Sequence, residues 1–221
     1  MLAYFVTGAF VGFLAGLLGI GGGMTLVPIL AAMFAAQHLA PDHTVHMALG
    51  TGMASIMFTS SASVRMHHRL GGVDWSLVRR LGPAMVAGTL LSTALSGWVP
   101  QRALALSFAV IVYAGATQIL LGRKPPAART TPGTPALVAI GVPVAVIGTI
   151  GYVFSGWQVA ELPRLALGFV YGPALLGIVA GSVITAPWGA RAAHRLPVQT
   201  LRRIFAGLLY VLATKMAWTY F

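Results

Sequence analysis

Four glycines near the N-terminus are the residues whose spacing points most clearly to chemistry. They are Gly19, Gly21, Gly22 and Gly23, within the stretch GLLGIGGGMTLVP. Such a run interrupts a helix, and a helix that starts again near Met24 leaves several backbone N–H groups without an intrahelical partner. These groups and the positive end of the helix dipole attract an anion. The sequence therefore predicts an anion-binding site at the glycines, with Thr25 in the first turn of the new helix.

The same region carries a second pattern, which predicts helix packing instead. Small residues recur at helical spacing at Gly8, Gly12, Gly16, Gly19 and Gly23. In a membrane, this spacing lets two helices approach closely. Packing accounts for the first three of these glycines. It does not account for Gly21 and Gly22, which lie off that face.

Hydroxyl groups form a further candidate set in the apolar run 44–64. Thr51, Ser55 and Thr59 recur at helical spacing and can share one face, where they could donate hydrogen bonds to the oxygens of an anion. Alternatively, each hydroxyl bonds back to a carbonyl of its own helix, as Ser and Thr often do in membrane spans. Nearby, Asp42 and His46 could shuttle protons, although a turn that precedes a helix explains them more simply.

The composition places these residues in a membrane protein. Of the 221 residues, 57% are hydrophobic and 8% charged, and the mean hydropathy is +0.85. Soluble domains carry about 25% charged residues. The net charge of +11 comes from short basic clusters between apolar runs, which is typical of loops that set membrane topology and not of a nucleic-acid-binding face.

The length of the apolar runs predicts the helices. Crossing about 30 Å of hydrocarbon takes roughly 20 residues. Seven runs are long enough, and an eighth, from Thr25 to Ala36, forms a short or half helix. The sequence thus predicts an all-α, multi-pass membrane protein with seven spans, at approximately 2–20, 44–64, 81–98, 103–121, 135–157, 165–188 and 204–220.

The basic loops predict the orientation. Eleven Lys and Arg residues flank three of the connections, whereas the intervening connections hold Arg102 and Arg164. By the positive-inside rule the three basic connections are cytoplasmic, and the C-terminus is outside. The side of the N-terminus depends on whether the short helix crosses. One basic connection, 123–135, is a Pro-rich linker that divides the chain.

The two sides of the linker resemble each other. Gly82-Pro83-Ala84 reappears as Gly172-Pro173-Ala174, each opening a long apolar run that ends near a tryptophan. An odd offset of three helices would place the copies in opposite orientations, as in transporters built from inverted repeats. We therefore predict an inverted-repeat bundle, with a first repeat at 1–122 and a shortened second repeat at 136–221. The alternative is that G-P-A is a common kink sequence.

Three stretches of the chain resemble one known family. GLLGIGGGMTLVP, the segment from Ala48 to Trp75 that begins ALGTGMAS, and the segment from Leu167 to Leu209 are similar to the TauE/SafE family of sulfite-exporter-like transporters. The resemblance implies a permease of the inner cell membrane for small anions such as sulfite, sulfonates, thiosulfate or related organosulfur compounds. It adds Gly50, from the A-x-G-T signature that also includes Thr51, so the candidate substrate-binding residues are Gly19, Gly21, Gly22, Gly23, Thr25, Gly50, Thr51 and Ser55.

One departure from the family concerns the second repeat. Members usually carry a second Gly-rich motif, which this chain lacks, so about two short segments are missing there. The groove beside 135–157 must then be filled by lipid or by a second copy of the chain, as a homodimer.

Enzymatic functions fit the sequence poorly. It holds three acidic residues, none of them inside a predicted span, and no catalytic or ATP-binding motif, so we expect neither an enzyme nor a cofactor. Two hypotheses remain, an anion permease and a non-transporting membrane scaffold or partner subunit.

Overall fold

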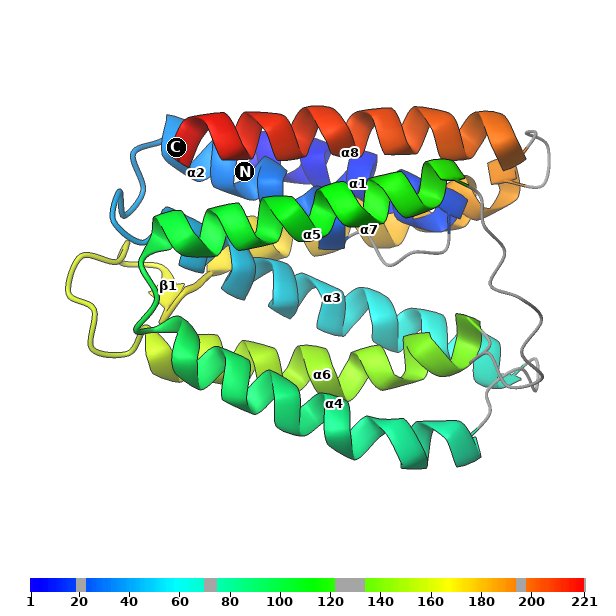
Figure 1. Cartoon of the computed structure of the whole chain (residues 1–221), viewed down its shortest axis with the longest axis horizontal. Coiled ribbons are helices and arrows are strands. Elements are labelled where there is room, and N and C mark those ends of the chain that lie inside the picture. The colour runs from blue at the N-terminus through cyan, green and yellow to red at the C-terminus, as the bar shows by residue number, and fades with distance from the viewer. Residues whose placement is uncertain (19–22, 70–74, 122–133, 194–197, 221) are drawn as a thin grey trace.

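The computed structural model describes residues 1–18, 23–69, 75–121, 134–193 and 198–220. Within them the chain is all-α apart from one short hairpin (Figure 1). The elements are α1 (Leu2–Leu18), α2 (Gly23–Ala36), α3 (Thr44–Arg69), α4 (Trp75–Ser96), α5 (Gln101–Leu121), α6 (Thr134–Ser155), β1 (Ala166–Leu167), β2 (Val170–Tyr171), α7 (Gly172–Ala193) and α8 (Val198–Tyr220).

The predicted run 165–188 needs a correction, because its first residues are not helical. Residues 166–171 form an antiparallel hairpin, and α7 begins only at Gly172. Gly168 makes the turn with a φ of 55°, and a Cβ there would lie 2.1 Å from the carbonyl oxygen of Val153. Only glycine combines this backbone conformation with so close an approach.

The two ends of the bundle differ in what they carry. Figure 1 places the ends of α3, α5 and α7 and the starts of α4, α6 and α8 at one end. This basic end includes Arg79, Arg80, Arg191 and Arg203. The turn between α2 and α3, the hairpin and both termini lie at the other end, which we call the hairpin end (Figure 1).

Helices α1 and α7 pack through glycines, as the helical spacing of small residues in the sequence predicts. A Cβ on Gly8, Gly12 or Gly16 would lie 2.4, 2.3 or 2.1 Å from backbone atoms of Ile178, Ser182 or Ala186, respectively. Each step of four residues on α1 meets a step of four on α7, so the two helices run parallel. Gly181 on α7 makes the reciprocal close contact with α1, because a Cβ on it would lie 2.3 Å from the Phe5 carbonyl oxygen.

Two other helix pairs run antiparallel. Between α3 and α6, Gly141 faces Ser60 and Gly148 faces Met53. Between α5 and α8, two reciprocal contacts join the same residue types: the hydroxyls of Tyr113 and Thr214 are 2.6 Å apart, and those of Thr117 and Tyr210 are 2.5 Å apart. The sequence Y-x-x-x-T therefore occurs once on each helix, and each copy bonds to the other.

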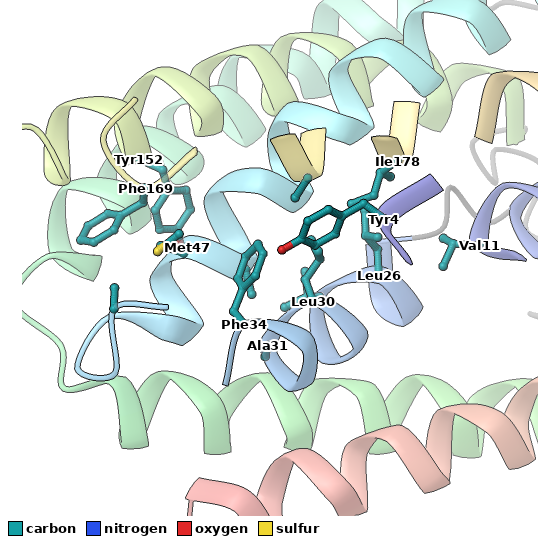
Figure 2. Packing of buried hydrophobic residues seen from close by; sticks show 14 residues of the cluster. Tyr4, Val11, Leu26, Leu30, Ala31, Phe34, Met47, Tyr152, Phe169 and Ile178 are labelled. Carbon is teal, nitrogen blue, oxygen red and sulfur yellow. The ribbon is translucent and has the colours of Figure 1, made fainter. Parts of the chain in front are cut away.

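Helix α2 is short and starts inside the bundle. Its 14 residues extend about 21 Å, whereas the 26 residues of α3 extend about 39 Å. A Cβ on Gly23, the first residue of α2, would lie 2.9 Å from the side chain of Ile56, halfway along α3. From there α2 runs to the hairpin end, where its buried Leu30 and Phe34 pack near Tyr4 (Figure 2).

The helices meet the length and composition of a membrane span to different degrees. In the described part of the chain, Gln101–Leu121 and Gly172–Gly189 are both long and apolar enough to cross a membrane. Leu2–Gly16, Gly23–Ala36 and Ile140–Ser155 are apolar but shorter. Helices α3, α4 and α8 carry Arg, Lys or clustered Ser and Thr residues, which lower their hydropathy.

Candidate functional site

A small cavity lies among α1, α2, α3 and α7, close to the level at which α2 begins. Its volume is about 20 Å³, which is room for about one water molecule. The lining is apolar except for three hydroxyl side chains. The lining residues are Val11, Gly12, Ala15, Leu26, Ser55, Ile56, Thr59, Ile178 and Ser182.

The three hydroxyls bond to their own helices. Ser55 Oγ donates to the Thr51 carbonyl at 2.8 Å, Thr59 Oγ1 to the Ile56 carbonyl at 3.2 Å, and Ser182 Oγ to the Val179 carbonyl at 3.1 Å. The back-bonding alternative from the sequence therefore holds in this conformation. Each oxygen keeps lone pairs that can accept, and rotation about χ1 would turn its proton toward a ligand.

The start of α2 brings positive electrostatic character to this region. Gly23 lies beside Ile56, and Ile56 also lines the cavity. The first N–H groups of a helix have no intrahelical acceptor, and the dipole gives that end a partial positive charge. None of the residues that line the cavity carries a formal charge. Among the described residues near it, the start of α2 contributes the partial positive charge.

Gly50 and Thr51 lie in a different contact, toward the hairpin end. Thr51 Oγ1 accepts a hydrogen bond of 3.0 Å from the backbone N–H of Tyr171 in β2. Gly50 lets the hairpin approach, because a Cβ there would lie 2.7 Å from the Phe169 carbonyl oxygen. Both α3 residues are fully buried.

The structure thus divides the predicted site residues into groups. Ser55 lines the cavity and Gly23 opens the helix beside it, whereas Gly50 and Thr51 hold the hairpin one to two turns away. Thr25 is buried in the first turn of α2. Gly19, Gly21 and Gly22 fall outside the described residues.

Sequence reasoning missed Ser182, which closes the cavity from α7. The signal was present, because Gly177 and Gly181 mark the face of α7 that α1 covers, and Ser182 follows them directly. A residue on that face is brought to α3 only by tertiary packing, which the local pattern does not encode.

Comparison with known proteins now decides the family. The sequence matches the family described as sulfite exporter TauE/SafE over residues 4–161 and 137–216. The chain belongs to the TauE/SafE family. Its matches cover the glycine-rich region, α3 and the whole cavity lining, so the resemblance noted from the motifs is confirmed.

Curated TauE/SafE-like relatives are named as transporters. A "probable membrane transporter protein" of Haemophilus influenzae is 31% identical over 257 aligned residues, covering 98% of this chain and 97% of that protein. The "probable membrane transporter protein YunE" of Bacillus subtilis is 27% identical over 186 residues, covering 76% and 68%. No solved structure matches the chain.

The first of these relatives also bears on the length of the chain. Its alignment of 257 positions exceeds the 221 residues of this chain by 36, so at least that many positions have no counterpart here. This TauE/SafE chain is therefore shorter than that relative. It is a membrane protein of a transporter family.

Proposed function

We propose that the chain is a multi-pass permease of the inner cell membrane for small anions, with sulfite and sulfonates as the substrate class. The observation that carries the proposal is the start of α2 halfway along α3, beside a cavity with three hydroxyls. At membrane depth, a helix terminus is tolerated where it lines a cavity or is buried in protein. The cavity, which now has room for about one water molecule, would have to widen to admit an oxyanion, and the anion would then accept hydrogen bonds from the α2 N–H groups and from Ser55, Thr59 and Ser182.

We further propose that transport uses two inverted repeats, α3–α5 and α6–α8. A two-fold axis in the membrane plane must pair each helix antiparallel with its copy, and the contacts of α3 with α6 and of α5 with α8 fit this requirement. In this proposal such an axis runs between α5 and α8, and the reciprocal Tyr–Thr contacts support it. Exchange of the two halves about it would open the cavity to either side in turn.

The topology in this proposal has seven spans, with the linker 123–135 in the cytoplasm. The basic end of the bundle is then the cytoplasmic end. The short helix α2 runs back to the hairpin end and so adds an eighth crossing to the seven spans, which puts the N-terminus outside together with the C-terminus.

The second candidate function is a non-transporting scaffold or partner subunit. The observation that favours it is the shortfall of 36 positions against the H. influenzae relative. Helix α4, which packs against α6, is broadly exposed: Leu90, Leu91 and Leu95 are 50, 64 and 55% exposed. We propose that a second copy of the chain covers this face, through the exposed small residues Ala84, Gly88 and Ser92.

Flux measurements separate the two functions. Purified protein is reconstituted in liposomes that are loaded with labelled sulfite or methanesulfonate. The efflux of the label is compared with that from protein-free liposomes. The permease predicts efflux that saturates with substrate and falls in a Ser55→Ala, Ser182→Ala double variant of normal abundance. If folded protein gives no more efflux than protein-free liposomes, the permease function is wrong and the scaffold function is supported.

A further inference from the structure

Two histidines lie together at the hairpin end, outside the candidate anion site. His43 precedes α3 and His46 lies in its first turn, with their ring centroids 5.6 Å apart. His46 is 4% exposed. Both rings pack on Phe169 of the hairpin, at centroid distances of 5.4 and 5.1 Å (Figure 2 shows Phe169 beside Tyr152 and Met47).

The hydrogen bonds fix which nitrogen of His46 carries the proton. Nε2 lies 2.9 Å from the carbonyl oxygen of Ser96, an acceptor, so in the neutral ring Nε2 is protonated and donates. Nδ1 then holds a free lone pair. It is buried and has no hydrogen-bond partner, and the same is true of Nδ1 of His43.

The surroundings of His46 contain few other titratable groups. His43 faces it from the preceding turn, and from α6 the hydroxyl of Tyr152 reaches Ser96, the residue whose carbonyl holds Nε2. Tyr220 of α8 lies one step further, beside Thr44. Asp42, the nearest carboxylate in the sequence, is exposed. Burial of the ring opposes a positive charge on it, and the neighbouring His43 adds to this opposition, whereas the carbonyls of Ser96, at the end of α4, and of Val99 just beyond it stabilise an imidazolium.

The histidines are connected to the core of the protein through the hairpin. The ring of Phe169 contacts both imidazoles, its carbonyl oxygen fits against Gly50, and the next residue but one, Tyr171, donates its N–H to Thr51. A proton on Nδ1 of His46 would place a charge and an unpaired donor against Phe169. A shift of the hairpin would give that donor room for an acceptor or water, and the same shift would loosen the hairpin's contacts with Gly50 and Thr51.

We propose that His46 is a proton-binding site that opens the hairpin end of the permease. A proton taken up on Nδ1 displaces the hairpin and admits the anion from that side, and its release lets the hairpin close. Imidazole suits this role because it gains and loses a proton between pH 5 and 8. This inference rests on the proposed transport function.

The test measures methanesulfonate flux in liposomes between pH 5 and 8, because this anion keeps one negative charge throughout. We expect flux in the unmodified protein to rise as the pH falls, by about tenfold per pH unit above the midpoint for one bound proton. His46→Gln keeps an amide N–H for the Ser96 carbonyl but binds no proton, so its flux should not vary with pH. His38→Gln is the matched control, since His38 is exposed in the same connection, and it should keep the full pH dependence.

A second measurement does not depend on transport. Nitrogen-15 NMR of the unmodified protein in micelles should show one imidazole Nδ1 that gains a proton between pH 5 and 8 and whose signal is absent in His46→Gln. A His46→Gln variant with the original pH profile, or a His46 ring that does not titrate in this range, would overturn the inference. Absence of flux at every pH, with a titrating His46, would instead count against the permease.

Discussion

Two glycines at the residue scale, Gly12 and Gly23, have opposite surroundings although both lie in the same glycine-rich region. A Cβ on Gly12 would meet the backbone of Ser182, whereas one on Gly23 would meet only the end of the Ile56 side chain. Backbone cannot yield and a side-chain methyl can. Gly12 also lines the cavity, so the two positions are distinguished by stability, which an added methyl should lower at Gly12 and not at Gly23.

Gly12→Ala should weaken assembly. The added methyl would lie 2.3 Å from the Cα of Ser182, which forces α1 and α7 apart. Overpacking of this kind costs about 1–3 kcal/mol. The measurement is membrane abundance together with the unfolding temperature in detergent. Gly207→Ala is the control, because no atom of the described residues lies within 4 Å of its Cβ position, and equal stability of the two variants would contradict the packing role.

Gly23→Ala should instead reduce flux at normal abundance. Its methyl sits at the start of α2, where it narrows the approach to the helix N–H groups, while Ile56 can rotate to accommodate it. Labelled sulfite or methanesulfonate efflux, normalised to protein amount, is the measurement. Flux at the original rate would show that the anion does not bind at this helix terminus.

The sequence identified some site residues better than others. Ser55 and Gly23 could be predicted because helical spacing and a glycine run are local signals. The different roles of Thr51 and Ser55 could not be predicted, because Thr51 bonds to the hairpin. The hairpin residue in this bond lies 120 residues later in the chain, so local spacing carries no signal of the contact. His46 was interpreted as part of a turn, and its burial follows from packing of α4 and Phe169 against it.

At the scale of elements, the contact between α3 and the hairpin can be tested on its own. Thr51→Val removes the acceptor of the Tyr171 N–H and leaves a buried donor unpaired. This costs about 1–3 kcal/mol of folding free energy. Thr51→Ser restores the oxygen and should recover most of the loss. Equal unfolding temperatures for the valine and serine variants would show that the bond contributes nothing.

Helix existence was predictable at this scale, and helix ends were less so. The short helix predicted from Thr25 to Ala36 is found at Gly23–Ala36. The run 165–188 is apolar throughout, and hydropathy alone does not distinguish the β-hairpin found at 166–171 from the start of a helix. The Y-x-x-x-T repeat of α5 and α8 was readable in the sequence, but its significance depends on the antiparallel contact.

For the whole molecule, the exposed face of α4 leads to a prediction about assembly. Gly88 has open space around its Cβ position, and Ala84 and Ser92 lie on the same side one turn away in each direction. If a second copy packs there, Gly88→Leu should convert dimers to monomers in native mass spectrometry. Gly207→Leu makes the same change on α8, where no described atom lies within 4 Å of the Cβ position, and should leave the dimer intact. Monomers alone in the unmodified protein would refute the homodimer.

Topology is the other prediction at this scale. The chain has no cysteine, so a single one at Ala127, within the linker, reports on one side of the membrane. We expect it to react with an impermeant maleimide only after the cytoplasmic face is exposed. A cysteine at Trp157, which is 65% exposed at the hairpin end, should react from outside in intact cells.

The glycine contact between α1 and α7 also sets the order of events during synthesis. Gly8 meets Ile178, and the intervening chain takes roughly 10–30 s to synthesise at 5–20 residues per second. During that time the close-packing face of α1 has no α7 to meet and is held by lipid or by the insertion machinery. A ribosome stalled before α7 would leave α1 in the membrane without its main partner, so premature termination should yield fragments that are inserted but quickly degraded.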